Sequence, residues 1–289
     1  MSSPAEPNRR MVELDDAELE VFDTGLADDH PIVCAAHPAE AFAAGTATLL
    51  AEVANTGVVC VNPRGLGAST ACEQVSMEAM VDDIEAVRHR LGLDPWIFWG
   101  MSGGGWLAQL YAHRHPDGLR GIVVESVCLC FRERVADPAC ALSPRFAAWR
   151  EPLAALGLLD EHAHADPDLG DDPEWLAVDG VGTVLRRRGG PALLVSPVPI
   201  SAEMRAAMPA MWGFDSRPWI RDVHTPALVL AGADDPVVPV HRVRAVHEAL
   251  AGSSFVLVDD AGHVPTSTRR PEVAAAFEAF LAANGLASG

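Results

Sequence analysis

Short apolar runs alternate with amphipathic stretches toward both ends of the chain. Runs rich in Val, Ile and Trp predict buried strands at residues 31–36, 57–62, 95–99, 121–126, 227–231 and 255–258. Two alternating runs, residues 11–14 and 18–22, flank Asp15 and Asp16 and predict an opening hairpin. Because buried strands separated by helices are typical of parallel sheets, we expect an α/β fold: a mostly parallel sheet with helices on both faces.

Helical periodicity is clearest after Ser76. Apolar side chains recur there at three- and four-residue spacing and predict an amphipathic crossover helix, which Gly92 ends: Met77, Met80, Val81, Ile84, Val87 and Leu91. Pro239 and Pro271 each suit the first turn of a further helix near the C-terminus.

The alternation stops between residues 128 and 222. This stretch is rich in Ala, Arg, Pro, Asp and Trp, and it predicts helices at residues 153–159 and 202–211 and an acidic loop at residues 166–174. We interpret it as an inserted cap made of helices rather than sheet. The expected division is therefore a core domain of residues 1–127 and 223–289, with a helical cap at residues 128–222.

Composition narrows the possible functions. Of the 289 residues 49% are apolar, 40 are acidic and 21 basic, and every basic residue is arginine. Without lysine, Schiff-base and P-loop chemistries are excluded. A net charge of −19 disfavours nucleic acid and membrane surfaces as partners. We expect a small-molecule substrate, no cofactor, and a monomer or homodimer.

Six cysteines lie mostly inside apolar runs, which predicts buried thiols in a reducing compartment. The Cys128-Leu129-Cys130 pair lacks the spacing of a zinc or redox site. No apolar run is long enough to span a membrane, and the first ten residues are polar, so a cytoplasmic location is expected.

A candidate nucleophile stands where the strand at residues 95–99 meets a helical stretch. Residues 100–104 read Gly-Met-Ser-Gly-Gly, the G-x-S-x-G pattern of a sharp turn that exposes a serine. A serine hydroxyl needs a histidine as general base and a carboxylate that orients the histidine. Asp234 and Asp235 follow the strand at 227–231, and His263 follows the strand at 255–258. Ser102, one of these carboxylates and His263 thus form a candidate triad.

With these residues in this order, the chain resembles the α/β-hydrolase superfamily from residue 11 to residue 284, with a cap inserted in the middle. The resemblance implies that Asp235, three residues after Gly232, is the acid. A minority of the family takes the acid from the end of the strand after the elbow helix, where this chain has Glu125. It also implies the α/β-hydrolase fold.

An oxyanion hole needs two backbone N–H donors. Gly103, directly after the nucleophile, is one candidate, at a helix N-terminus. In the family the other donor follows a His-Gly pair, but here Pro38 stands in place of the glycine. Because proline has no N–H, the second donor is expected to be Ala39, and His37 is expected to order the loop.

One competing motif points to a metal. His162, His164 and Asp166 match the first part of the H-x-H-x-D-H motif of metallo-β-lactamase-like enzymes. Pro167 replaces the final histidine and no buried strand precedes the motif. We therefore expect an exposed polar helix end and no metal.

Aromatic and methionine side chains of the cap either line an acyl pocket or form the core of the cap. For substrate contacts we select Trp106, Met211 and Trp212. The favoured function is hydrolysis of a carboxylic ester or lactone through an acyl-enzyme on Ser102. The alternatives are a proline-iminopeptidase-like aminopeptidase, in which an acidic cap residue such as Glu203 would bind the substrate amine, and a non-catalytic ligand-binding protein.

Overall fold

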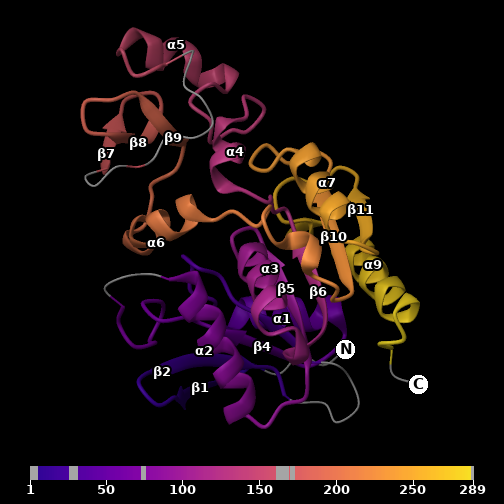
Figure 1. The fold of residues 1–289 in the computed structure, drawn as a ribbon. Coiled ribbons are helices and arrows are strands. Elements are labelled where there is room, and N and C mark those ends of the chain that lie inside the picture. The colour runs from indigo at the N-terminus through magenta and orange to yellow at the C-terminus, as the bar shows by residue number, and fades with distance from the viewer. Residues whose placement is uncertain (1–5, 26–31, 73–75, 161–168, 170–172, 288–289) are drawn as a thin grey trace.

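The structure is a computed structural model, and it describes the chain except residues 1–5, 26–31, 73–75, 161–168, 170–172 and 288–289 (Figure 1). In chain order the strands and α-helices are β1 (Asn8–Glu13), β2 (Glu18–Asp23), β3 (Val33–Ala35), α1 (Ala44–Ala54), β4 (Val58–Val61), α2 (Met77–Arg90), β5 (Trp96–Met101), α3 (Gly104–Arg114), β6 (Leu119–Glu125), α4 (Phe131–Ala136), α5 (Ala147–Ala155), β7 (Pro173–Val178), β8 (Gly182–Arg187), β9 (Ala192–Ser196), α6 (Ala202–Gly213), β10 (Ala227–Gly232), α7 (Val240–Ala249), β11 (Ser254–Val258), α8 (Pro265–Thr268) and α9 (Arg270–Ala283).

The main sheet has eight strands in the order β1-β2-β4-β3-β5-β6-β10-β11. Strand β2 pairs antiparallel with β1 and β4, and the pairs from β4 onward are parallel. The predicted opening hairpin, the mostly parallel sheet and the crossover helix after Ser76 are confirmed. The Ser76 side chain caps α2 by accepting the N–H of Ala79.

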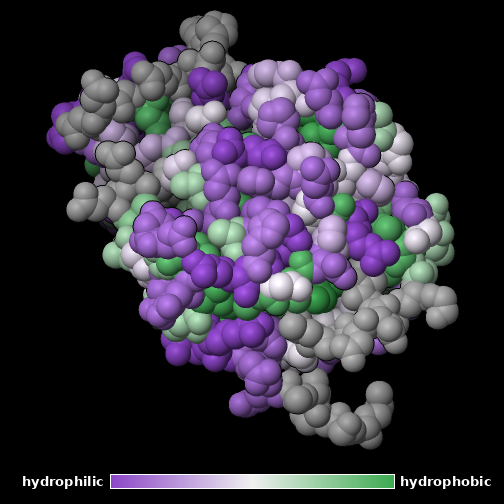
Figure 2. Space-filling model, turned by 60° about the horizontal axis from the view of Figure 1, so that its bottom comes forward, coloured by the Kyte–Doolittle hydropathy of each residue, from purple (hydrophilic) through white to green (hydrophobic). Residues whose placement is uncertain are grey.

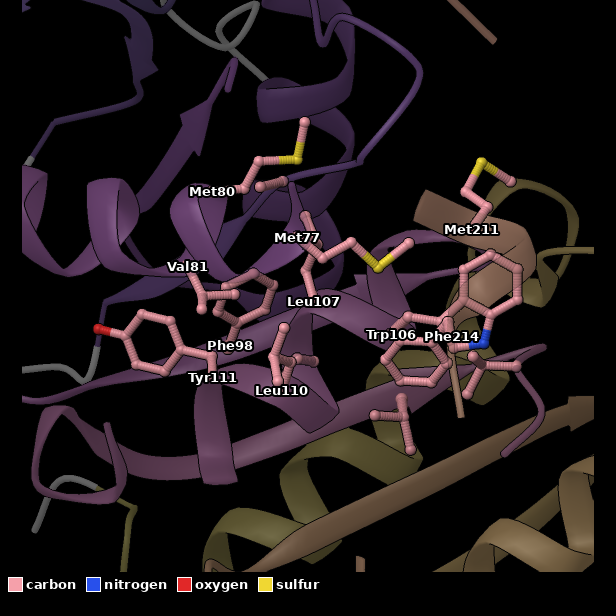
Figure 3. Packing of buried hydrophobic residues seen from close by; sticks show 14 of the residues in the cluster. Met77, Met80, Val81, Phe98, Trp106, Leu107, Leu110, Tyr111, Met211 and Phe214 are labelled. Carbon is pink, nitrogen blue, oxygen red and sulfur yellow. The ribbon is translucent and has the colours of Figure 1, made fainter. Parts of the chain in front are cut away.

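Helices cover both faces of this sheet (Figure 1), and the inner strands β3, β4 and β5 are buried along their whole length. On one face α1 and α9 pack through side chains such as Leu50 and Phe277. On the other, α2, α3 and α7 pack through Ile84, Leu107 and Val243. Figure 3 shows part of this second core, with Phe98 of β5 and Tyr111 of α3 side by side; their ring centroids are 5.4 Å apart.

The segment at residues 128–222 differs from the expectation of helices alone. Strands β7, β8 and β9 form a separate three-stranded antiparallel sheet. Leu176, Val184 and Val195 are cross-strand partners, and this small sheet shares a hydrophobic cluster with Leu153 of α5. Val184 and Val195 are fully buried in that cluster, and apolar cross-strand pairs of this kind stabilise a sheet at these residues. The predicted helix at 202–211 is confirmed as α6, whereas the one predicted at 153–159 lies earlier, as α5.

The inserted segment, residues 128–222, leaves and rejoins the core at neighbouring points, because Cys130 and Asp215 form a β-bridge. It lies across one end of the main sheet (Figure 1). Met211 of α6 and Phe214 pack beside Trp106 of α3, so part of the inserted segment shares the core of the main sheet (Figure 3). The exact domain boundaries stay a prediction.

Hydrophilic residues cover most of the face shown in Figure 2, with apolar residues in small patches between them. No helix among the described residues is long and apolar enough to cross a membrane. None of the six cysteines, all of them in the described part of the chain, forms a disulfide.

Candidate active site

Ser102 occupies the tight turn between β5 and α3, with a φ of 51°. A left-handed conformation is strained for a serine, and it persists here because the surroundings fix it. The Ser102 N–H donates to the Glu125 carbonyl at 2.8 Å. A Cβ atom on Gly100 would lie 2.3 Å from the Gly104 carbonyl oxygen, and one on Gly104 would lie 2.4 Å from the Ala36 carbonyl oxygen. The turn therefore requires glycine at both positions.

Ser102, His263 and Asp235 form a hydrogen-bonded chain. His263 Nε2 lies 2.9 Å from Ser102 Oγ, and His263 Nδ1 lies 2.9 Å from Asp235 Oδ2. The other carboxylate oxygen of Asp235 accepts the N–H groups of Val237 and Val238 at 2.8 and 3.0 Å. Burial alone would raise the pKa of Asp235, but the hydrogen bonds and the nearby His263 hold it below its ordinary value. A buried, ionised carboxylate is suited to orienting an imidazole.

The two other candidate acids do not reach His263 by a hydrogen bond. Asp234 is exposed beside the buried Asp235. Glu125 is fully buried, and its carboxylate accepts Thr266 N–H at 2.7 Å, Thr266 Oγ1 at 2.6 Å and Trp99 Nε1 at 3.1 Å. Glu125 thus ties β6 and β5 to the start of α8, just after His263.

The predicted oxyanion donors differ in their surroundings. Among the described residues the Gly103 N–H has no hydrogen-bond partner, whereas the Ala39 N–H donates to His37 Nδ1 at 3.2 Å. His37 is buried, and burial, with His263 adding to it, lowers the pKa of His37 to about 4. At neutral pH the ring is uncharged, and because Nδ1 accepts a hydrogen bond, the proton is on Nε2. A Cβ atom on Gly103 would lie 2.6 Å from that Nε2, so glycine at 103 leaves room for the ring.

A cavity of about 290 Å³ opens beside the serine, between the core and the inserted segment. Ser102, Gly103, His37 and His263 are among the residues that line it. Apolar side chains form most of the remainder, among them Trp106, Phe131, Leu194, Met204, Met208 and Met211.

Of the predicted substrate contacts, Trp106 and Met211 line this cavity and Trp212 does not. The Trp212 ring instead packs edge-on against Phe131, with the centroids 5.6 Å apart, inside the core that the inserted segment shares with the main sheet. Glu203 is exposed and also lies outside the lining. Two charged lining residues, Arg134 and Glu40, were not singled out from the sequence, which carries no signal separating them from neighbouring charges.

The structure describes no group of three His, Cys, Asp or Glu residues that could hold a metal ion. The motif of His162, His164 and Asp166 lies outside the described residues, as does most of the predicted acidic loop.

Comparison with known proteins gives a family and several relatives. A model described as "Alpha/beta hydrolase family" matches residues 30–276. The proline iminopeptidase of Neisseria meningitidis (serogroup A, serotype 4A) is 38% identical over 76 residues, 25% of this chain and 24% of that protein. The match thus spans about a quarter of the length of that relative. The proline iminopeptidase of Lactobacillus delbrueckii subsp. bulgaricus is 23% identical over 239 residues, 75% of this chain and 77% of that protein.

Among solved structures, an alpha/beta fold family hydrolase from Bacillus anthracis str. Sterne superposes with a TM-score of 0.73. It is 16% identical, and the superposition covers 96% of this chain and 100% of the other. The two chains therefore share a fold.

Proposed function

The chain belongs to the alpha/beta hydrolase family and has its fold, and from this premise we propose that it is a serine hydrolase acting on a carboxylic ester or lactone of a small molecule. The observation that carries the proposal is the hydrogen-bonded chain from Ser102 Oγ through His263 to Asp235, with both bonds at 2.9 Å. It opens onto a cavity large enough for a small substrate.

In the first half-reaction Ser102 Oγ attacks the ester carbonyl carbon while His263 Nε2 accepts the hydroxyl proton. Asp235 Oδ2 accepts the Nδ1–H and stabilises the imidazolium. The tetrahedral intermediate collapses, the C–O bond to the leaving group breaks, and His263 returns the proton to the departing alkoxide. In the second half-reaction water, activated by the same imidazole, releases the acid and restores the Ser102 hydroxyl.

The negative charge on the carbonyl oxygen is held by backbone N–H groups. We assign the first donor to Gly103, whose N–H is free of other described partners at the N-terminus of α3. We assign the second to Ala39, as the resemblance implies. Its hydrogen bond to His37 is long, at 3.2 Å, so the N–H can be shared between the ring and the oxyanion in a three-centre bond.

Initial rates with p-nitrophenyl acetate test the triad. We expect Ser102→Ala and His263→Ala to lose at least about a thousandfold in kcat, and Asp235→Asn to lose roughly a thousandfold or more. Asp234→Asn is the matched control, because its carboxylate is exposed beside Asp235; its rate should stay within about twofold of wild type. Retained activity in Ser102→Ala, or equal losses in the two aspartate variants, would refute these roles.

A second candidate is cleavage of an N-terminal residue from a peptide, which the similarity to proline iminopeptidases supports. That reaction requires a carboxylate near the serine to bind the free amine. Glu203 lies outside the cavity, and Glu40 is the carboxylate that lines it among the described residues. Faster turnover of proline p-nitroanilide than of p-nitrophenyl acetate, lost in Glu40→Gln, would favour the peptidase.

A non-catalytic ligand-binding protein is the remaining alternative. This alternative predicts that wild type hydrolyses activated esters no faster than Ser102→Ala. The p-nitrophenyl acetate rates of these two proteins therefore test it as well.

A further inference from the structure

Arg134, on α4, is a cation inside the candidate substrate cavity. The residue is only 4% exposed, and it lines the same cavity as Ser102 and His263. Its guanidinium lies over the rings of Phe131 and Trp106, with its central carbon 4.4 and 5.3 Å from their centroids. An arginine side chain is charged at every physiological pH, so this charge stands at an apolar wall of the cavity.

The guanidinium has no counter-ion within the part of the chain that the structure describes. Its Nε makes no hydrogen bond, and no carboxylate of a described residue forms an ion pair with it. The two acidic residues of the same region are engaged elsewhere: Glu133 pairs with Arg217 and Arg242, and Asp137 pairs with His241 and Arg242.

An unpaired buried charge is costly, and stacking on aromatic rings offsets only part of that cost. A guanidinium also presents several N–H donors in a planar fork that matches a carboxylate. Glu40, the other charged residue of the lining, is exposed, where water screens its repulsion of an anion. Arg134 therefore lacks a counter-ion, and a small anion that enters the cavity would supply one.

We propose that Arg134 binds a carboxylate of the substrate, so that the protein prefers esters of small dicarboxylic acids, in which one carboxyl group is esterified and the other is free. This inference rests on the proposed function as far as the hydrolytic reaction is concerned. The negative charge of the substrate is inferred from Arg134 alone. With about 290 Å³ available, the acyl chain is a short one.

The test compares monoethyl succinate, glutarate and adipate with the corresponding primary amides, which have the same shape and no charge. Calorimetric binding to Ser102→Ala separates recognition from catalysis. We expect at least one carboxylate to bind about tenfold or more tightly than its amide. The ratio of the amide Kd to the carboxylate Kd should fall to about one in Ser102→Ala/Arg134→Met. The methionine in this variant keeps apolar contact with the rings.

Arg205→Met in the Ser102→Ala background is the matched control, since Arg205 is exposed on α6 and outside the cavity lining. The amide-to-carboxylate Kd ratio of this control variant should equal that of Ser102→Ala. Thermal melting of each variant shows whether it is folded, and Arg134→Lys, which keeps the charge, should retain part of the preference if the methionine variant fails to fold.

A ratio near one at all three chain lengths, or a preference that survives loss of Arg134, would overturn the inference. Hydrolysis of neutral esters without any charge preference would leave the serine hydrolase proposal intact and remove this one. A preference for the charged ligand in a protein that hydrolyses no ester would support the role of Arg134 and refute the serine hydrolase proposal.

Discussion

Glu125 allows the choice of catalytic acid to be tested against a purely structural role. It is fully buried, and burial raises its pKa while hydrogen bonds from Thr266 and Trp99 oppose that rise. In Glu125→Leu the three donors that now bond to the carboxylate lose their acceptor inside the core. Each unsatisfied donor costs about 1–3 kcal/mol, and relief of the buried carboxylate offsets part of the total. The expected loss of unfolding free energy is about 3–5 kcal/mol.

Glu125→Gln keeps one acceptor oxygen, so we expect it to lose about 1–2 kcal/mol and to fold. Urea denaturation followed by tryptophan fluorescence measures both losses. Hydrolysis of p-nitrophenyl acetate by Glu125→Gln should stay within about tenfold of wild type, whereas Asp235→Asn should lose roughly a thousandfold or more. A Glu125→Gln variant of normal stability whose kcat falls as far as that of Asp235→Asn would make Glu125 the catalytic acid and refute the reasoning.

Three further predictions concern the surroundings of the site. Because burial lowers the pKa of His37 from 6.5 to about 4, the unfolded chain takes up this proton first as the pH falls. The unfolding free energy should therefore fall by up to about 3 kcal/mol between pH 6.5 and 4, and urea titrations of His37→Gln should lack this part of the pH slope. Gly103→Ala should slow ester hydrolysis by displacing His37, and a double-mutant cycle with His37→Ala should show strong coupling, whereas additive losses would contradict the contact. Leu153→Ala should remove about 2–5 kcal/mol of packing from the cluster of the inserted segment, seen as faster limited proteolysis there; unchanged proteolysis would count against that cluster.

The main sheet was predictable because its strands are apolar and are separated by helical stretches. The stretch after Ser76 has the clearest helical periodicity. Their order of appearance also placed Ser102, Asp235 and His263 after the strands that bring them together. The β7–β9 sheet was missed because charged and glycine-rich turns separate its strands, so its apolar positions do not form a continuous pattern along the sequence. Only the pairing of Leu176, Val184 and Val195 makes that pattern visible.

The lining of the cavity was less predictable than the triad. Trp212 and Met211 are neighbours on α6, yet Met211 lines the cavity and Trp212 packs against Phe131 outside the lining. The sequence around Arg134 is nearly the same as that around Arg132. Arg134 reaches the cavity because α4 packs against Trp106. Burial of this kind depends on how helices dock, which local sequence does not specify.

The most direct test of the central claim is the intact mass of the protein after exposure to a fluorophosphonate probe, with peptide mapping of the adduct. We predict a single adduct on Ser102, absent in Ser102→Ala, strongly slowed in His263→Ala and formed at the wild-type rate in Asp234→Asn. No adduct on the folded wild-type protein, or an adduct that persists in Ser102→Ala, would contradict a serine hydrolase acting through this triad.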